Sequence, residues 1–238
     1  MGGPKCPVYA AGRSPLARKH RGGEAIVWTP DKNIVDALDG AFHLAFKAVV
    51  PAGTNHLIGL DVSGSMSMGQ VAGTFLTPRD AAAAMAMVTL RTEPWTHIIA
   101  FCDKVREIQI SASERLDEVD RQTSSLPFGG TDCALPMIYA LKNKLDVDTF
   151  HVLTDSETWA GNIQPVQALQ QYRREMSKPQ AKLIVVGMVS NGFTIADPQD
   201  GGMLDVVGFD TATPVLMADF ARGGPPPKVL SGYDELDI

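Results

Sequence analysis

Cysteines, long apolar runs and an excess of positive charge are all scarce in this sequence, and each shortage excludes a class of protein. Only Cys6, Cys102 and Cys133 occur in 238 residues. Their number and spacing do not suit a zinc site, and the odd count predicts reduced thiols and a cytoplasmic location. No apolar run could span a bilayer, and residues 1–20 lack the apolar core of a signal peptide, so we expect no membrane association. The net charge of −6 predicts no general attraction to nucleic acid.

The motifs of common hydrolases and nucleotide-binding proteins are also missing. A serine hydrolase would need a G-x-S-x-G elbow, which the segment around Ser63 does not provide. No G-K-S/T follows Gly129 and Gly130, so they do not form a phosphate loop. An aspartyl phosphatase needs a second acid two residues after Asp61, where Ser63 stands. We therefore expect no enzyme, and a metal-dependent hydrolase is the less favoured alternative.

Short apolar runs alternate with helical patterns through most of the chain, whose apolar content of 45% can supply a sizeable core. The predicted strands are 57–60, 96–101, 105–110, 150–154, 182–188 and 204–209. The predicted helices between and after them are 79–91, 113–123, 133–145, 164–176 and 213–221. This alternation predicts an α/β fold, a doubly wound and mostly parallel sheet with helices on both faces. The strand at 105–110 is expected to pair antiparallel at one edge.

We divide the chain into a lead-in segment (1–28), a domain that includes an N-terminal helix (29–222) and a flexible tail (223–238). The lead-in is rich in glycine, proline and basic residues; without interleaved aromatic residues it is typical of a solvated linker, and an RNA-binding arm is the alternative. It ends in a predicted edge strand at 25–28. Thr29 is predicted to cap the first helix, as Thr77 does for the helix at 79–91. Seven apolar residues of the first helix recur at helical spacing: Ile34, Val35, Leu38, Phe42, Ala45, Phe46 and Val49. We expect this stripe to face the core, with partner binding as the alternative.

Four histidines lie in apolar sequence contexts, namely His43, His56, His97 and His151. Histidines in such contexts are typically buried structural residues rather than ligands, and we expect the same of these.

Oxygen-bearing side chains follow the carboxyl ends of two predicted strands. Asp61, Ser63 and Ser65 follow the first strand, and Asp155 follows the strand at 150–154. Thr131 lies in a glycine-rich loop. Ligands of open α/β sheets bind beyond the carboxyl ends of the strands, where the topology brings these segments together. Donors that are all oxygen select a hard cation, so Mg²⁺ is expected, and Mn²⁺ or Ca²⁺ is compatible.

The charge of this donor set indicates what the metal could bind. The D-x-S-x-S segment alone would also suit a turn with helix-capping serines, but a second aspartate and a threonine loop favour a metal site. Only two of the five donors carry negative charge, so the metal would stay electron-poor. We expect it to accept an anionic oxygen from outside, such as an Asp or Glu carboxylate of a protein partner.

Three segments, DVSGSMS, GGTD and LTDSE, together resemble the metal-ion-dependent adhesion site of von Willebrand factor type A domains, over residues 55–222. The resemblance implies a Rossmann-like fold. It also implies that Ser63, Ser65 and Thr131 bind the metal directly. Asp61 and Asp155 would bind it directly or through water.

Longer stretches are similar to the carboxyl-terminal half of the Ro autoantigen family: FGGTDCALPMIYA, TDSETWAGN and KLIVVGMVSNGFTIADPQDGGMLDVVGFD. Ro proteins are ribonucleoproteins whose helical-repeat ring binds Y RNAs and the ends of misfolded RNAs. No paired-helix repeat occurs in this sequence, so the chain corresponds to the type A domain. The resemblance implies a metal-dependent protein-interaction domain in noncoding RNA quality control. Direct RNA binding through the basic N-terminal segment is the alternative.

Overall fold

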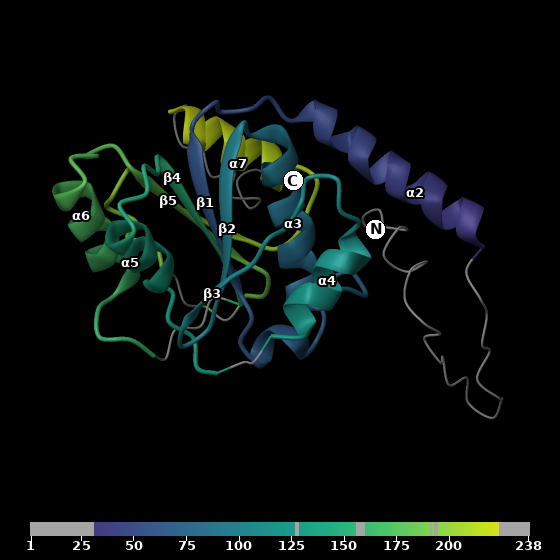
Figure 1. Cartoon of the computed structure of the whole chain (residues 1–238), viewed down its shortest axis with the longest axis horizontal. Coiled ribbons are helices and arrows are strands. Elements are labelled where there is room, and N and C mark those ends of the chain that lie inside the picture. Colours follow the sequence, from purple (N-terminus) through teal and green to yellow (C-terminus); the bar gives the residue numbers. More distant parts are fainter. Residues whose placement is uncertain (1–30, 127–128, 156–159, 191, 193–194, 224–238) are drawn as a thin grey trace, which may run out of the picture.

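The computed structural model describes residues 31–126, 129–155, 160–190, 192 and 195–223. A single six-stranded sheet lies at its centre, in the order β3-β2-β1-β4-β5-β6 (Figure 1). The strands are β1 (Asn55–Asp61), β2 (Trp95–Phe101), β3 (Val105–Glu107), β4 (Thr149–Thr154), β5 (Lys182–Gly187) and β6 (Met203–Val207). All neighbouring pairs are parallel except β2 and β3. The predicted α/β fold with one antiparallel edge strand is confirmed.

Helices cover both faces of this sheet (Figure 1). They are α2 (Lys32–Ala45), α3 (Pro78–Thr92), α4 (Leu116–Ser124), α5 (Leu135–Lys142), α6 (Pro165–Glu175) and α7 (Thr213–Arg222). Two 3₁₀ turns, η1 (Phe46–Ala48) and η2 (Ser65–Ser67), complete the regular structure of the described residues. Within those residues, no helix is both long enough and apolar enough to cross a membrane.

Alternate residues of each strand enter two separate cores, as a pleated sheet requires. Ile58 and Leu60 of β1 pack with α3, α4 and α7 on one face, whereas Leu57 packs with α5 and α6 on the other. Gly59 allows α5 to come close to the sheet, because a Cβ atom at this position would lie 2.6 Å from Cγ of Pro136. The central strand therefore has both faces buried, which explains its nearly continuous apolar sequence.

The sequence predicted most helix and strand boundaries to within three residues of those in the structure. Thr77 caps α3 as predicted: its side chain accepts a hydrogen bond from the Asp80 amide at 3.3 Å, and the Asp80 carboxylate accepts one from the Thr77 amide at 2.9 Å. Pro78 occupies the first turn, where a missing N–H costs nothing. The antiparallel strand is shorter than predicted, because only residues 105–107 pair with β2.

The cap predicted for α2 was wrong, and its predicted core-facing stripe is confirmed only in part. Its cap is Asp31 rather than Thr29, with the Asp31 carboxylate accepting hydrogen bonds from the amides of residues 33 and 34 at 2.8 and 3.4 Å. No residue of α2 itself is buried, and within the stripe Phe42 packs against the core whereas Ile34 is 60% exposed. The helix projects past the sheet instead of lying on it (Figure 1). The spacing of its apolar residues predicted the helix correctly, but it did not show what packs against the apolar face.

Ion pairs and two aromatic residues connect α2 to the rest of the domain. Phe42 packs against the core, and Phe46 is the buried residue of η1. Arg115, which precedes α4, pairs with Asp36 at 3.1 Å and with Asp39 at 3.9 Å. The predicted edge strand at 25–28, the lead-in and the tail after Gly223 lie outside the described residues.

Candidate metal centre

The parallel pairing of β1 and β4 brings the two predicted aspartates to the same edge of the sheet. Leu60 pairs with Leu153, so Asp61 and Thr154 end the two strands side by side. The Thr154 hydroxyl donates to Oδ2 of Asp61 at 2.7 Å, and Asp155 follows directly. Both aspartates are buried. We call this the carboxyl edge of the sheet.

Asp61 is a carboxylate in a poorly solvated position. It is 1% exposed, and its Oδ1 accepts a hydrogen bond from the Ser63 amide at 2.8 Å. Burial raises the pKa of Asp61 to about 6, although hydrogen bonds from Ser63 and Thr154 oppose the shift, and the negative charge of Asp155 raises it further. The ionised form is therefore disfavoured here, and a nearby cation would stabilise it.

The two loop serines are held side by side by a tight turn. The Ser63 and Ser65 hydroxyl oxygens are 3.1 Å apart. This matches the spacing of about 3 Å between adjacent oxygens around Mg²⁺, which binds its ligands at about 2.1 Å in octahedral geometry. Met66 of this turn is buried, and the Met68 amide donates to the Ser65 carbonyl at 2.8 Å. The turn thus presents both hydroxyls from one short segment.

Backbone hydrogen bonds bring the threonine loop to the same edge. The Asp132 amide donates to the Cys102 carbonyl at 2.9 Å, just after β2, and the Ala160 amide donates to the Thr131 carbonyl at 2.9 Å. Val62, between Asp61 and Ser63, donates to the Phe101 carbonyl at 2.9 Å, so both loops are tied to the end of β2. Thr131 is buried at 3% exposure.

The five predicted residues therefore come from three loops that meet at the carboxyl edge, and their identity as metal ligands stays a prediction. Their donor set fits a hard divalent cation, since it combines two carboxylates and three hydroxyls with no nitrogen or sulfur. Across the described ranges no cluster of three or more His, Cys, Asp or Glu side chains could hold a metal. The candidate centre is of a different kind, because hydroxyls make up most of it.

Two residues that support this centre were not predicted. Thr154 orients Asp61 through the hydrogen bond described above, and Asp132 holds the start of the next helix, since its Oδ1 accepts from the Ala134 amide at 3.0 Å. Burial raises the pKa of Asp132. Thr154 could have been found from its place at a strand end immediately before Asp155. Asp132 gave no signal beyond its place in the GGTD segment.

The cysteines and histidines agree in part with expectation. Cys102 and Cys133 are buried thiols rather than disulfide partners, and Cys6 lies outside the described residues. His56 and His151 are buried, but His43 and His97 are only partly so.

Comparisons with known proteins agree with the motifs at the strand ends. The family model described as the Ro60 vWA domain matches residues 55–221. The chain is 52% identical over 197 residues to RNA-binding protein RO60 of Deinococcus radiodurans, covering 82% of this chain and 37% of that protein. It is 39% identical over 216 residues to RNA-binding protein RO60 of Caenorhabditis elegans, covering 91% of this chain and 32% of that protein.

A solved structure gives the same result. The crystal structure of the Deinococcus radiodurans RO (RSR) protein superposes with a TM-score of 0.74 at 50% identity, covering 87% of this chain and 41% of that one. The chain thus spans between a third and two fifths of the length of these relatives. The region matched by the family model, residues 55–221, contains β1, all three candidate ligand loops and most of α7. On these grounds the chain belongs to the Ro60 vWA domain family.

Proposed function

We propose that this chain is a metal-dependent protein-interaction domain of a Ro-type ribonucleoprotein that acts in noncoding RNA quality control. In this proposal it is not an enzyme and works in the cytoplasm. The observation that carries the proposal is the convergence of Asp61, Ser63, Ser65, Thr131 and Asp155 at one edge of the sheet. The buried Asp61 carboxylate supports it most directly, because burial penalises its ionised form and a nearby cation would relieve that penalty.

The chemistry of the donor set supports a binding role. Ser63, Ser65 and Thr131 would hold the ion directly, and Asp61 and Asp155 directly or through water. When bound, the ion would act as a Lewis acid for a carboxylate from an Asp or Glu of a partner protein. The hydroxyls add no negative charge, so the partner's carboxylate would complete the neutralisation of the ion.

Calorimetric titration with Mg²⁺ and Mn²⁺ tests the proposal. The wild type is expected to bind one ion, and the double variant Asp61→Ala, Ser65→Ala is expected to lose that binding. A matched control exchanges the exposed pair Asp117→Ala, Ser113→Ala, which should leave binding unchanged. Unaltered binding in the Asp61, Ser65 variant would refute the assignment.

The names of the relatives favour RNA binding as the second candidate, since both are described as RNA-binding proteins. In the longer proteins the RNA would be held by the helical-repeat ring that the Ro resemblance implies. The basic lead-in offers a direct route in this chain, through residues such as Arg13, Arg18 and Arg21. A gel shift with structured RNA, with and without residues 1–24, separates the two. A salt-sensitive shift that is lost on truncation would favour direct RNA binding.

A further inference from the structure

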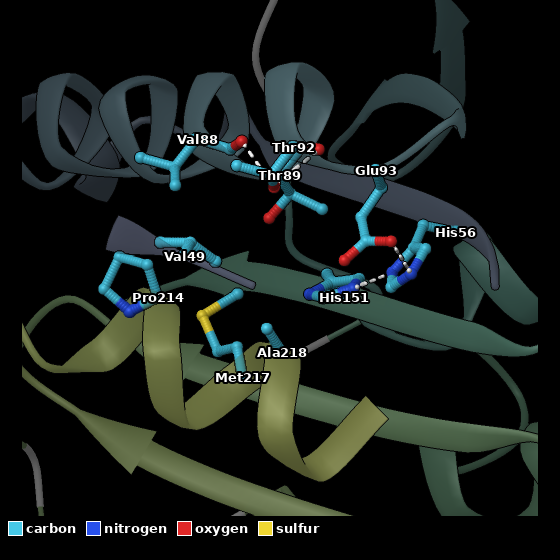
Figure 2. A pocket seen from close by; sticks show the side chains of 10 residues that line it. All are labelled: Val49, His56, Val88, Thr89, Thr92, Glu93, His151, Pro214, Met217 and Ala218. Carbon is cyan, nitrogen blue, oxygen red and sulfur yellow. Dashed lines mark hydrogen bonds and ion pairs between the residues drawn. The ribbon is translucent and has the colours of Figure 1, made fainter. Parts of the chain in front are cut away.

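A small pocket lies at the opposite edge of the sheet, near the amino-terminal ends of β1 and β4. Its cavity volume is about 10 Å³, room for about one water molecule. Two helices enclose it: α3 contributes Thr89 and Glu93, and α7 contributes the apolar Met217 and Ala218 (Figure 2). His151 of β4 completes the wall between them (Figure 2). Half of its ten lining residues are apolar, and the polar ones come from the sheet (His56 and His151) and from the end of α3 (Thr89, Thr92 and Glu93).

Three of its residues lie in a row, which we call the histidine relay: His151, His56 and Glu93. Nε2 of His151 lies 2.8 Å from Nδ1 of His56, which is a hydrogen bond, and Nε2 of His56 lies 3.4 Å from Oε2 of Glu93. Nε2 of His56 also lies 3.0 Å from the Thr54 hydroxyl. Backbone amides of residues 52 and 53 donate to the two carboxylate oxygens of Glu93 at 2.7 and 2.9 Å. All three side chains are buried. The relay therefore runs from the loop before β1, through two strands, to the pocket.

The far nitrogen of His151 faces the pocket. Nδ1 of His151 is buried and has no hydrogen-bond partner among the residues that the structure describes. Figure 2 shows one ring nitrogen of His151 turned to His56 and the other to the space between α3 and α7. A buried polar atom of this kind is unusual, because buried polar groups are nearly always paired. It is therefore a site at which the relay can take up a proton from the pocket.

The unpaired nitrogen of His151 fixes the proton positions of the neutral relay. A hydrogen on Nδ1 of His151 would be an unsatisfied buried donor, which costs more than an unfilled acceptor. His151 therefore donates from Nε2 to Nδ1 of His56. The proton of His56 is then on Nε2, which faces the Thr54 hydroxyl at 3.0 Å and the Glu93 carboxylate at 3.4 Å.

Protonation would reverse the polarity of the pocket. A proton bound at Nδ1 of His151 lets the Nε2 proton pass to Nδ1 of His56, so that His56 becomes cationic beside Glu93 and His151 stays neutral. The relay gains one positive charge and no bond is broken apart from the N–H bond that moves. Nδ1 of His151 is then a buried donor where the neutral relay has a buried acceptor, and the apolar side chains of α7 line the same pocket. Such a donor favours the entry of water.

The two ends of α7 are held differently. Lys182 of β5 donates to two carbonyl oxygens in the last turn of α7 at 2.7 and 2.9 Å, and Arg222 donates to the Val50 carbonyl at 2.7 Å and pairs with Asp219. Asp210 holds the start of the helix, since its Oδ1 accepts from the amides of residues 212 and 213 at 2.7 and 3.0 Å. The rest of the first half contributes Pro214 and Met217 to the pocket through apolar contacts, and Ala218 follows at the start of the second half. Water in the pocket would therefore loosen the first half of α7 before the second.

We propose that the histidine relay is an acid-responsive switch that controls the packing of the first half of α7. At neutral pH the relay is uncharged and the pocket stays closed by α7. Below the titration of the relay, the new donor on His151 draws water under Met217 and releases that half of the helix. Glu93 and Asp148 favour the charged form of His56, and burial opposes it. Burial also lowers the pKa of His151, and His56 adds to that shift.

Hydrogen exchange on the full chain tests the proposal, with amides of residues 216–219 as the reporter. Corrected for intrinsic rates, their exchange should be about tenfold faster at about pH 5 than at about pH 7.5, while residues 220–222 change less. His151→Gln and His56→Gln should abolish the response. The matched control His43→Gln removes a partly buried histidine on α2 and should retain it.

Three results would overturn the switch. These are unchanged protection of α7 in the wild type, the same acceleration in both relay variants, or an equal acceleration at the strand amides, which reports global unfolding. Nitrogen-15 NMR of the wild type needs no variant and decides the same point. It should show His151 protonated at Nε2 and bare at Nδ1 at neutral pH, and a proton on Nδ1 at neutral pH would contradict the proposal.

Discussion

The two edges of the sheet bury ionisable groups of opposite kind, and the same physical cause gives them opposite responses to pH. At the carboxyl edge, burial raises the pKa of Asp61 to about 6. At the amino-terminal edge, burial lowers the pKa values of His56 and His151. Burial therefore penalises the charged form of the ionisable groups at both edges. Asp61 makes the domain less stable as pH rises, whereas the histidines make it less stable as pH falls.

The two edges also differ in what would relieve the free-energy cost of a buried charge. Asp61 lies among hydroxyls and a second carboxylate, a set that a divalent cation can satisfy. The histidine relay ends in a single nitrogen facing a small pocket, where only a water-sized molecule fits. The comparison teaches that one edge is suited to a charged ligand and the other to a change of protonation.

The largest effect expected on both edges at once comes from the strand that they share. Gly59→Ala would place a Cβ atom 2.6 Å from Pro136 and about as close to Phe101 as packing permits, at 3.1 Å. Overpacking of this kind costs about 1–3 kcal/mol. Chemical denaturation should show this loss at every pH, because the clash involves no titrating group. A loss confined to acidic or to alkaline pH would mean that the edges are coupled through β1.

Asp61→Asn should isolate the contribution of the carboxyl edge to stability from that of the amino-terminal edge. Removing the buried charge should stabilise the metal-free domain at pH 7 by about 3 kcal/mol, since the pKa of Asp61 is raised from 3.8 to about 6 and one pKa unit corresponds to about 1.4 kcal/mol. The same change should abolish any stabilisation by Mg²⁺. Thermal unfolding with and without Mg²⁺ measures both effects. If the variant is less stable than the wild type in metal-free buffer, the Asp61 carboxylate does not destabilise the metal-free domain.

The histidines should give the next largest effect, at acidic pH. The unfolded histidines have pKa values near 6.5 and the folded ones lie lower, so the unfolded state binds more protons below pH 6.5. The free energy of unfolding should therefore fall as pH drops, by at most about 1.4 kcal/mol per pH unit for each proton. Denaturation of His151→Gln should show a shallower fall than that of the wild type. If the free energy of unfolding depends on pH with the same slope in both proteins, the relay does not contribute to the acid response.

The smallest effect is expected at α2, away from both edges. Leu44 is 62% exposed, so Leu44→Ser should change the free energy of unfolding by less than about 0.5 kcal/mol. Phe46→Ala serves as the contrast, because Phe46 is buried and its loss should cost about 3 kcal/mol or more. Comparable losses in the two variants would show that the exposed face of α2 is covered in solution.

The sequence predicted the carboxyl edge better than the amino-terminal one, for a physical reason. The polar residues of the carboxyl edge follow directly on apolar strands, and parallel pairing brings strand ends together whatever the exact register. The histidine relay depends on register, since His56 pairs with Thr149 while His151 pairs with Ile58. No spacing in the sequence shows which residue of β4 lies beside His56.

Local and tertiary signals differed in the same way at the helices. Thr77 and Pro78 determine the start of α3 through bonds within one turn, so the sequence was sufficient there. The apolar face of α2 was visible from its spacing, but its packing depends on distant elements, and Ile34 is exposed. Asp31 rather than Thr29 caps that helix, because two capping residues lie two positions apart and sequence spacing alone does not rank them.

A crystal structure grown with Mn²⁺ and recorded at the manganese absorption edge would test the metal centre most directly. The account predicts one anomalous peak at the carboxyl edge, about 2.2 Å from the Ser63 and Ser65 hydroxyls and the Thr131 hydroxyl. It also predicts a carboxylate or water oxygen at the remaining position. A well-ordered edge with no peak, or with Asp61, Thr131 and Asp155 turned away from one another, would contradict it.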